Sequence, residues 1–251
     1  MVTFETTIQD HLLRMYADFP LKNAAGAIFK TLVQISAKTN IFSGRFVMCF
    51  GWAHFFIDER QEENGDKFWV VQTTDYKNDP QKNRTDNVTV SLLVQNMQIE
   101  AVQKSETKPE PVTFKDTILV LKEAVGAENV MLSRGDATKD GDSGWYFGLV
   151  DDPNEDNHKP DEYERVPSYE LLNFRTEALR VLQMPVGTVA VINKNNLIGL
   201  FDNDGNPLKF TTEEERKKFA AERAEAEKRG EAPGIQGVTF EEQPAENDTK
   251  E

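Results

Sequence analysis

The sequence predicts an α+β fold: an N-terminal helical hairpin, an antiparallel or mixed sheet and short helices, then a charged C-terminal helix and a disordered tail. Helical and strand periodicities both occur among the 251 residues, without the regular strand–helix–strand alternation of a doubly wound parallel sheet. Hydrophobic residues make up 38% of the chain, which is enough for a sizeable core. Turn signals separate the apolar segments, and no internal repeat is present.

The predicted helical hairpin depends on the apolar spacing near the N-terminus. Ile8, Leu12 and Met15 recur at helical intervals, and Pro20 ends this segment. Residues 22–37 repeat the same spacing. A second helix is therefore expected to pack against the first.

The segments that follow alternate between strand and helix signals. The dense apolar run at residues 45–57 and the segment 67–74 are joined by an Asn-Gly turn, which predicts a hairpin. The polar residues 75–86 are expected to form a loop. Further strands are expected at residues 88–94, 97–102, 129–134 and 143–150 and in a hairpin over 188–201, and helices at residues 114–125 and 168–183.

The net charge of −14 comes from 43 acidic and 29 basic residues. Such a chain repels phosphate backbones and anionic membrane surfaces, so neither a nucleic acid nor a membrane is an expected partner. The charge is concentrated in two places. Residues 136–170 hold eleven acids and three bases, and residues 211–251 hold twelve acids and seven bases.

Composition sets apart a charged C-terminal region (211–251). The division of the rest into an N-terminal α+β region (1–128) and a second folded region (129–210) is what the family resemblance given below implies. Threonines at an N-cap position, acids in the first turn and bases near the end predict a helix over residues 211–230. Residues 231–251 combine proline, glycine and acids, which predicts disorder.

Cys49 is the single cysteine, so no disulfide can form within the chain, and a reducing cytoplasm is the expected location. No apolar run reaches the roughly 20 residues of a membrane span, and the N-terminus lacks the pattern of a signal peptide. One cysteine and three histidines offer few zinc ligands, so no metal or cofactor is expected. Cys49 is expected in the core, and His158 in solvent.

Short motifs in the acidic stretch favour turns over reactive sites. The string GDSG at residues 141–144 matches the nucleophile region of trypsin-like proteases, but no matching histidine context exists and Trp145 replaces a second glycine. Residues 136–147 fit the first half of a calcium loop, with Phe147 where a bidentate glutamate is needed. Both are better interpreted as turns. No catalytic residue is assigned, so the chain is not expected to be an enzyme.

Trp145, Tyr146 and Phe147 stand out beside these acids. On a strand, Trp145 and Phe147 share one face and Tyr146 takes the other. One interpretation places the larger face in the core. The other is a recognition surface, where aromatic side chains anchor a basic protein partner and carboxylates steer it. The residues assigned to this candidate partner-binding surface are Asp142, Trp145, Tyr146, Asp151, Asp152, Glu155 and Asp156.

The segment GDATKDGDSGWYFGLVDD, followed by YELLNF and LQMPVGTVAV, resembles the bacterial immunity protein 33 domain family. The shared features are an Asp-Ser-Gly-Trp stretch at 142–145, the acidic pair at 151–152, a short helix, and a Leu-x-x-Pro-x-Gly turn at 182–187. The resemblance covers about residues 129–208. The chain departs from the family in the loop, where residues 153–167 form an extra segment.

The resemblance implies a cytoplasmic protein that binds and neutralises a toxin used in competition between bacteria. The acidic stretch would then steer a basic toxin domain toward the protein. Two alternatives stay open. One is a housekeeping interaction protein without a toxin. The other is a small-molecule-binding protein or enzyme whose site lies between the two α+β regions, where the aromatic stretch Phe46–Phe56, Phe68 and Trp69 would line it.

Overall fold

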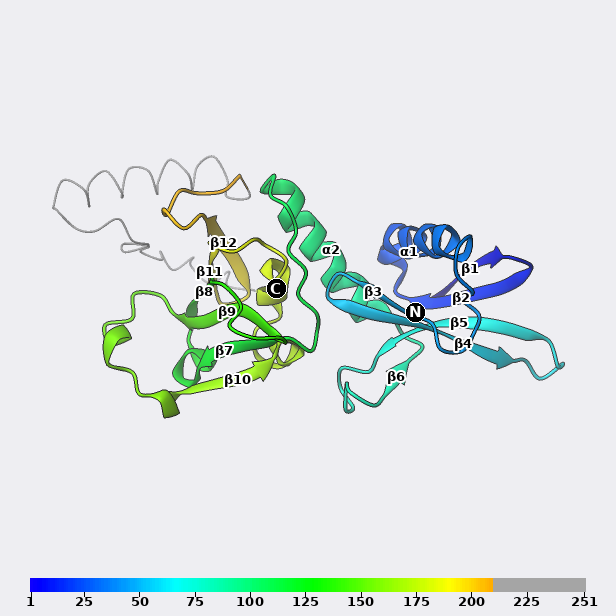
Figure 1. Cartoon of the computed structure of the whole chain (residues 1–251), viewed down its shortest axis with the longest axis horizontal. Helices are drawn as coiled ribbons and strands as arrows, with labels where there is room; N and C mark the ends of the chain where they lie inside the picture. Colours follow the sequence, from blue (N-terminus) through cyan, green and yellow to red (C-terminus); the bar gives the residue numbers. More distant parts are fainter. Residues whose placement is uncertain (210–251) are drawn as a thin grey trace, which may run out of the picture.

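A computed structural model describes residues 1–209 of the chain. It contains two lobes, each built on a six-stranded sheet, with helix α2 (Thr89–Lys104) running between them (Figure 1). The mixed sheets and short helices confirm the predicted α+β class. The helix expected at residues 211–230 and the disorder expected at 231–251 lie outside the described residues. None of the described helices combines the length and apolarity needed to cross a membrane.

The N-terminal unit contains the first sheet, in the order β1-β2-β5-β4-β3 with β6 paired to β5. Neighbours are antiparallel except for β2 and β5. Helix α1 contacts β1, and its apolar side covers one face of the sheet (Figure 1). The elements are β1 (Val2–Ile8), β2 (His11–Ala17), α1 (Lys22–Ser36), β3 (Val47–Phe50), β4 (Ala53–Gln61), β5 (Lys67–Thr74) and β6 (Arg84–Thr85).

The C-terminal unit contains the second sheet, in the order β10-β7-β9-β8-β11-β12. The parallel pair here is β7 with β9, and both strands lie inside the sheet. Short helical segments connect β10 to β11. The last of them, Thr176–Val181, contacts α2, β11 and β12. The elements are β7 (Thr117–Leu121), β8 (Asn129–Arg134), β9 (Asp142–Leu149), β10 (Tyr163–Pro167), α3 (Leu171–Phe174), β11 (Val189–Asn193) and β12 (Asn196–Phe201).

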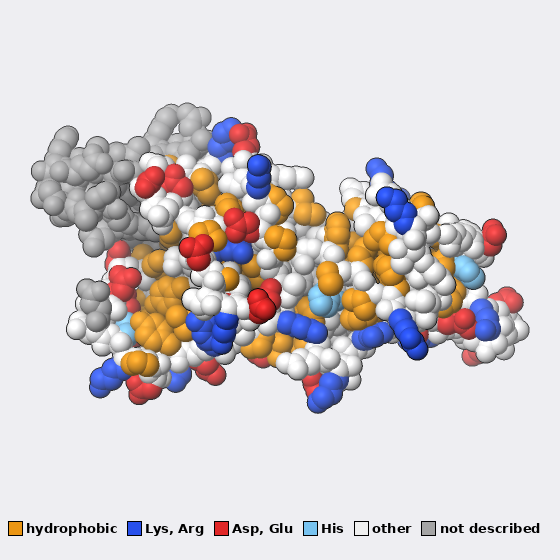
Figure 2. Space-filling view, in the orientation of Figure 1, with side chains coloured by type: hydrophobic (Ala, Val, Ile, Leu, Met, Phe, Trp, Pro, Cys, Tyr) orange, Lys and Arg blue, Asp and Glu red, His pale blue; other side chains and the backbone are white. Residues whose placement is uncertain are grey.

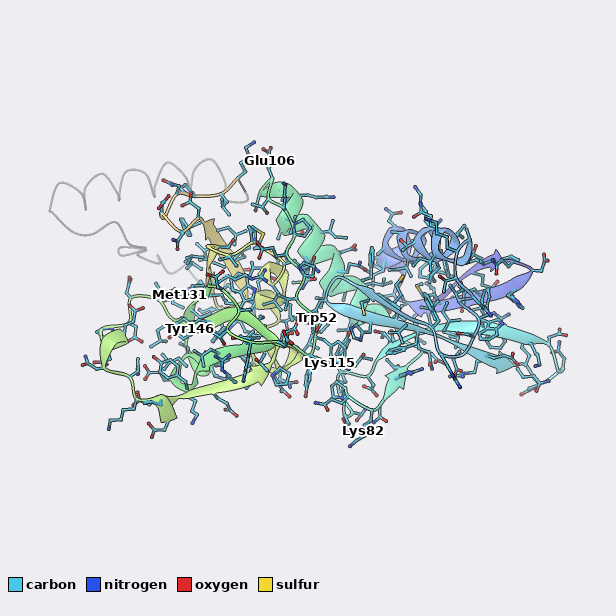
Figure 3. All side chains as sticks on the ribbon, viewed as in Figure 1. Trp52, Lys82, Glu106, Lys115, Met131 and Tyr146 are labelled. Atoms are coloured by element: carbon cyan, nitrogen blue, oxygen red, sulfur yellow. The ribbon has the colours of Figure 1, made fainter. Side chains whose placement is uncertain are left out.

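Trp52 joins the two units. It sits in the turn between β3 and β4, is fully buried, and lies at the junction of the lobes (Figure 3). Its indole Nε1 donates a hydrogen bond to Ser168 Oγ at 2.8 Å, and its carbonyl accepts one from the Phe114 backbone N–H at 2.9 Å. The buried apolar residues of both sheets consequently form one continuous core.

The aromatic stretch that could have lined a pocket mostly fills this core instead. Trp52 and Phe55 are fully buried, and Trp69 is 9% exposed. The ring of Trp52 stacks on Tyr76 at 4.7 Å and meets Phe114 edge-on at 6.3 Å. These rings stabilise the junction by burial of apolar surface.

The predicted N-terminal helical hairpin is wrong in its first half, because residues 2–17 form the β1–β2 hairpin. Gln9 and Asp10 both have positive φ angles, 51° and 64°, as a two-residue primed turn requires. Gln-Asp is not a typical sequence for such a turn. Leu13, Met15 and Ala17 alternate as buried residues of a strand. In the sequence this alternation was masked by the helical spacing of Ile8, Leu12 and Met15. The second predicted helix is confirmed as α1.

The two strands expected at residues 88–94 and 97–102 are also wrong, because this segment is helix α2. Its inward face includes the polar residues Ser91 and Gln98, which are fully buried. Ser91 Oγ lies 2.5 Å from Thr73 Oγ1, and Gln98 Nε2 donates to the Leu179 carbonyl at 2.9 Å. Because polar residues occupy part of the buried side, the sequence of this helix lacks the apolar spacing by which a helix is recognised.

Two predicted helices in the C-terminal unit need correction. Residues 117–121, inside the first of them, form strand β7. The second, at residues 168–183, is broken into short segments at Arg175, whose backbone leaves the helical region (φ −156°, ψ 71°). The buried guanidinium of Arg175 donates to the carbonyls of Ala127 and Lys194, and this contact explains the break. The other predicted strands are confirmed as β3–β5, β8, β9, β11 and β12.

Ser168, at the start of the helix predicted over residues 168–183, uses its hydroxyl at the junction between the two units. It accepts from Trp52 and donates to the Thr113 carbonyl at 2.9 Å. Ser168→Ala leaves the buried indole N–H of Trp52 without a partner, while the Thr113 carbonyl keeps the Asp116 backbone N–H, so we expect a loss of about 2 kcal/mol in the free energy of unfolding. Urea denaturation measures it. The control Ser133→Ala, on β8, should change stability by less than about 0.5 kcal/mol, and an equal effect of both would contradict the assignment.

Candidate functional site

The turn that leads into β9 is built around Gly144. This residue has a φ of +75°, and a Cβ there would lie 2.2 Å from the Gly135 carbonyl oxygen, so only glycine fits. The Ser143 hydroxyl donates to the Thr117 carbonyl at 2.8 Å and accepts from the Trp145 backbone N–H at 3.2 Å. The Asp-Ser-Gly-Trp stretch therefore has a structural role in the entry to β9.

Asp142 belongs to this turn. Its side chain is 4% exposed and pairs with Arg165 at 3.1 Å. It accepts hydrogen bonds from the hydroxyl of Thr138 at 2.6 Å and from the backbone N–H of Gly144 at 3.2 Å. Burial opposes ionisation, but these partners outweigh it and lower the pKa of Asp142 to about 2. The expected partner contact of Asp142 is therefore corrected to a buried structural carboxylate.

Trp145 is likewise a core residue, which corrects its assignment to the partner-binding surface. The side chain is 1% exposed, and its indole N–H donates to the Leu182 carbonyl at 3.0 Å. Phe147 shares this face, is fully buried and meets the ring of Phe174 at 5.5 Å. The interpretation of this strand face as core is the one that the structure supports.

Tyr146 takes the opposite face of β9, as the alternation predicts, and lies in the C-terminal unit (Figure 3). Its ring lies along the strand over Gly148, where a Cβ would meet the phenol oxygen at 2.4 Å. It faces Tyr163 of β10, with ring centroids 6.2 Å apart. Burial, Tyr163 and the nearby carboxylates raise the pKa of Tyr146 to about 12. The phenol is therefore neutral near pH 7.

The chain between β9 and β10 forms the acidic loop, residues 150–162, at the end of the C-terminal unit far from the N-terminal unit (Figure 1). Asp151 begins it in a left-handed conformation with a φ of +54° and is exposed, as is Glu155. Of Asp156 only the backbone is described. Both described carboxylates are available to a partner.

His158 holds the acidic loop together, which corrects the expectation that it is solvated. Its side chain is 7% exposed. Its Nε2 lies 2.7 Å from Asp152 Oδ2 and 3.5 Å from Glu123 Oε1, and its Nδ1 lies 2.8 Å from Glu162 Oε2. The hydrogen bonds to Glu162 and Asp152 raise the pKa of His158. Asp152, 6% exposed at its side chain, therefore serves this network more than a partner.

The sequence reasoning missed Glu123 and Glu162. Glu162 lies four residues after His158, a spacing that brings two side chains together in a single turn. Glu123 comes from the 3₁₀ segment Lys122–Gly126 after β7, and no local pattern connects it to the acidic loop. Its proximity follows from the parallel pairing of β7 and β9, a tertiary feature.

Outside the acidic loop the surface is mixed. Figure 2 shows carboxylates and basic side chains spread over both units of this face, with apolar side chains between them. The acidic loop itself carries six acids and one lysine. Cys49, expected in the core, is exposed on β3, while its neighbour Met48 is buried.

Comparison with protein families gives a match that fits this geometry. Residues 97–202 match the family model of the Imm33-like domain. The matched segment begins inside α2 and ends at β12, so it contains the second sheet and the acidic loop. The Imm33-like match confirms the resemblance seen in the sequence and extends it toward the N-terminus. Comparisons with curated proteins and with solved structures give no match.

The position of Asp142 gives a pH-dependent prediction. Its pKa is lowered in the folded state, so its ionised form stabilises the fold above about pH 4, and this contribution disappears as the pH falls toward about 2. Asp142→Asn should therefore cost about 2 kcal/mol of unfolding free energy at neutral pH.

Denaturant titrations of wild type and Asp142→Asn at several pH values check this prediction. The difference between them should shrink between about pH 4 and pH 2, in the range where the wild type still folds. The matched control is Asp140→Asn, since Asp140 is exposed in the same turn. A constant difference across this pH range would show that Asp142 does not act through its charge.

Proposed function

We propose that this protein is a non-enzymatic immunity-type protein of the cytoplasm, which neutralises a toxin by binding a basic protein domain through the acidic loop. The observation that supports this proposal is the exposure of Asp151 and Glu155 on a loop that projects from an Imm33-like domain. Immunity function requires only that the toxin be bound in an inactive state. A recognition surface is sufficient for it, without reactive groups.

The charge of the acidic loop suits a basic partner. Unpaired surface carboxylates raise the association rate of a cationic protein by long-range attraction. Asp151 and Glu155 make no ion pair in the described part of the chain, so their charge is available to a partner. Close contact would then involve exposed apolar groups. A candidate is Val125, which is 38% exposed in the segment Lys122–Gly126, the segment that also brings Glu123 to His158.

Attraction of this kind is screened by salt. The Debye length is about 10 Å at 0.1 M ionic strength and shrinks further at higher salt. A complex that forms by steering should assemble quickly at low salt and slowly at high salt. A partner held only by apolar contacts would show little change.

The first experiment identifies the partner and tests toxicity. The full chain, immobilised and used as bait in an extract of the source strain at about 50 mM salt, should retain a basic protein that elutes at about 0.5 M salt. Expression of that protein alone should arrest growth, and co-expression of the full chain should restore growth. A retained protein without toxicity would instead favour a housekeeping interaction role.

The kinetic prediction concerns charge at the acidic loop. Asp151→Asn combined with Glu155→Gln should slow association with the purified partner by about threefold to tenfold at low salt, because both lost charges face solvent. The dissociation rate should change less. Surface-based kinetics at low and high salt measure both rates.

A matched control removes the same charge elsewhere. Asp10 and Glu63 are exposed in the turns β1–β2 and β4–β5 of the N-terminal unit. Asp10→Asn with Glu63→Gln should leave the association rate within about twofold of wild type. Equal slowing by both double variants would mean that only the total charge matters, and the acidic loop would lose its assigned role.

A further inference from the structure

Three side chains from separate parts of the C-terminal unit converge beside β9. Glu123 comes from the 3₁₀ segment after β7, Asp152 from the turn after β9, and His158 from the chain that approaches β10. Their carboxylate oxygens and imidazole nitrogen all lie within 4.8 Å of one another. We call these three residues the Glu-Asp-His cluster.

The spacing inside the cluster is close to that of metal ligands, with His158 and Asp152 now at hydrogen-bond distance. His158 Nε2 lies 2.7 Å from the nearer oxygen of Asp152 and 3.5 Å from that of Glu123. Nitrogen and oxygen ligands bind Zn²⁺ at about 2.1 Å in a tetrahedral arrangement, so neighbouring ligand atoms are about 3.4 Å apart. Only small movements of these side chains would bring all three onto one ion.

The burial of the cluster is uneven. The side chains of His158 and Asp152 are 7% and 6% exposed, whereas that of Glu123 is 55% exposed. Two ligands therefore sit at the bottom of the site, and the third closes it from the solvent side. Such an arrangement leaves one tetrahedral position open to water or to an exogenous group.

Glu162 adds the partner that a metal-bound histidine needs. Its Oε2 lies 2.8 Å from His158 Nδ1, on the side of the ring away from the cluster. A carboxylate at this position keeps a proton on Nδ1, so that Nε2, once it releases the proton that it shares with Asp152, can offer its lone pair to an ion. This is the outer-shell contact typical of histidine ligands in metal sites.

The charge around the imidazole also favours a cation. Glu123, Asp152 and Glu162 surround His158, and no lysine or arginine forms an ion pair with them within residues 1–209. Even when His158 is the imidazolium cation, its one positive charge beside three carboxylates leaves two negative charges without a basic partner. The nearby Lys122 ammonium instead donates to the backbone carbonyl of Asp161 at 2.6 Å.

We propose that Glu123, Asp152 and His158 form a binding site for one divalent transition-metal ion, with Zn²⁺ as the ion favoured by one imidazole and two carboxylates. The ion would tie the acidic loop to the segment after β7 and fix the position of Asp151. This site does not depend on the proposed toxin partner, and its test requires no partner.

The test titrates ZnCl₂ into the full chain, without an affinity tag and after treatment with a chelator, in a calorimeter at neutral pH. The wild type should bind one Zn²⁺ with a dissociation constant of about 10 μM or lower. Asp152→Asn should weaken this binding by at least about tenfold. Asp151→Asn, one residue away, should leave it unchanged.

This pair of variants is closely matched. Each removes one carboxylate from the same turn, and asparagine accepts the positive φ of residue 151. His158→Gln and Glu123→Gln should also weaken binding, and thermal melts of every variant confirm folding. If His158→Gln does not fold, Glu123→Gln tests the site instead. The Glu123 side chain lies at the surface, so its substitution should leave the fold intact.

Co²⁺ provides a second readout, since its visible absorption reports tetrahedral coordination by nitrogen and oxygen. The wild type should show this spectrum, and Asp152→Asn should lose it. The proposal is overturned if the wild type binds no Zn²⁺ below about 100 μM. Equal binding by wild type, Asp152→Asn and Glu123→Gln would overturn it as well, because the ion would then sit elsewhere.

Discussion

The site depends on a backbone constraint at Gly144. The chain passes so close to Gly135 that no side chain fits, and the Gly135 N–H donates to the Gly144 carbonyl at 3.0 Å. Because a strand alternates its faces, this fixed point sends Trp145 into the core and Tyr146 to the opposite face. Strand β9 lies between β7 and β8, so its exit is fixed too. The acidic loop therefore begins beside Tyr146 and within reach of the segment after β7.

Polar contacts, more than apolar burial, hold the acidic loop in place. His158 connects Asp152, Glu162 and Glu123, and the backbone N–H of Lys159 donates to Glu162 at 2.9 Å. Of these carboxylates only Asp152 is buried, whereas the side chains of Glu123 and Glu162 stay 55% and 47% exposed. The acid count of the sequence therefore overstates the charge that a partner meets. In the described part of the loop, the exposed carboxylates that make no ion pair belong to Asp151, Glu155 and Asp161.

The sequence predicted the α+β class and most strands of the C-terminal unit, where alternation and turn residues agree. The prediction from sequence failed in β2, where the apolar residues fit both a strand alternation and a helical spacing. It also failed in α2, where polar residues such as Ser91 face inward. For the site, the alternation along β9 correctly placed Tyr146 and Trp145 on opposite faces of the strand. It did not predict which of the two faces is buried in the core. Glu123 could not be placed from sequence, because its proximity to His158 depends on the pairing of two strands.

The two units form one body, and this limits where a partner of the acidic loop makes contact. Trp52 and Ser168 join the units through buried hydrogen bonds, and Gln98 of α2 bonds to the Leu179 carbonyl. The acidic loop lies at the opposite end of the C-terminal unit from this junction (Figure 1). Under the proposed function, a small domain that docked on the acidic loop would therefore meet the Imm33-like segment first. The N-terminal sheet lies on the far side of the junction, so it would be outside the reach of such a partner (Figure 1).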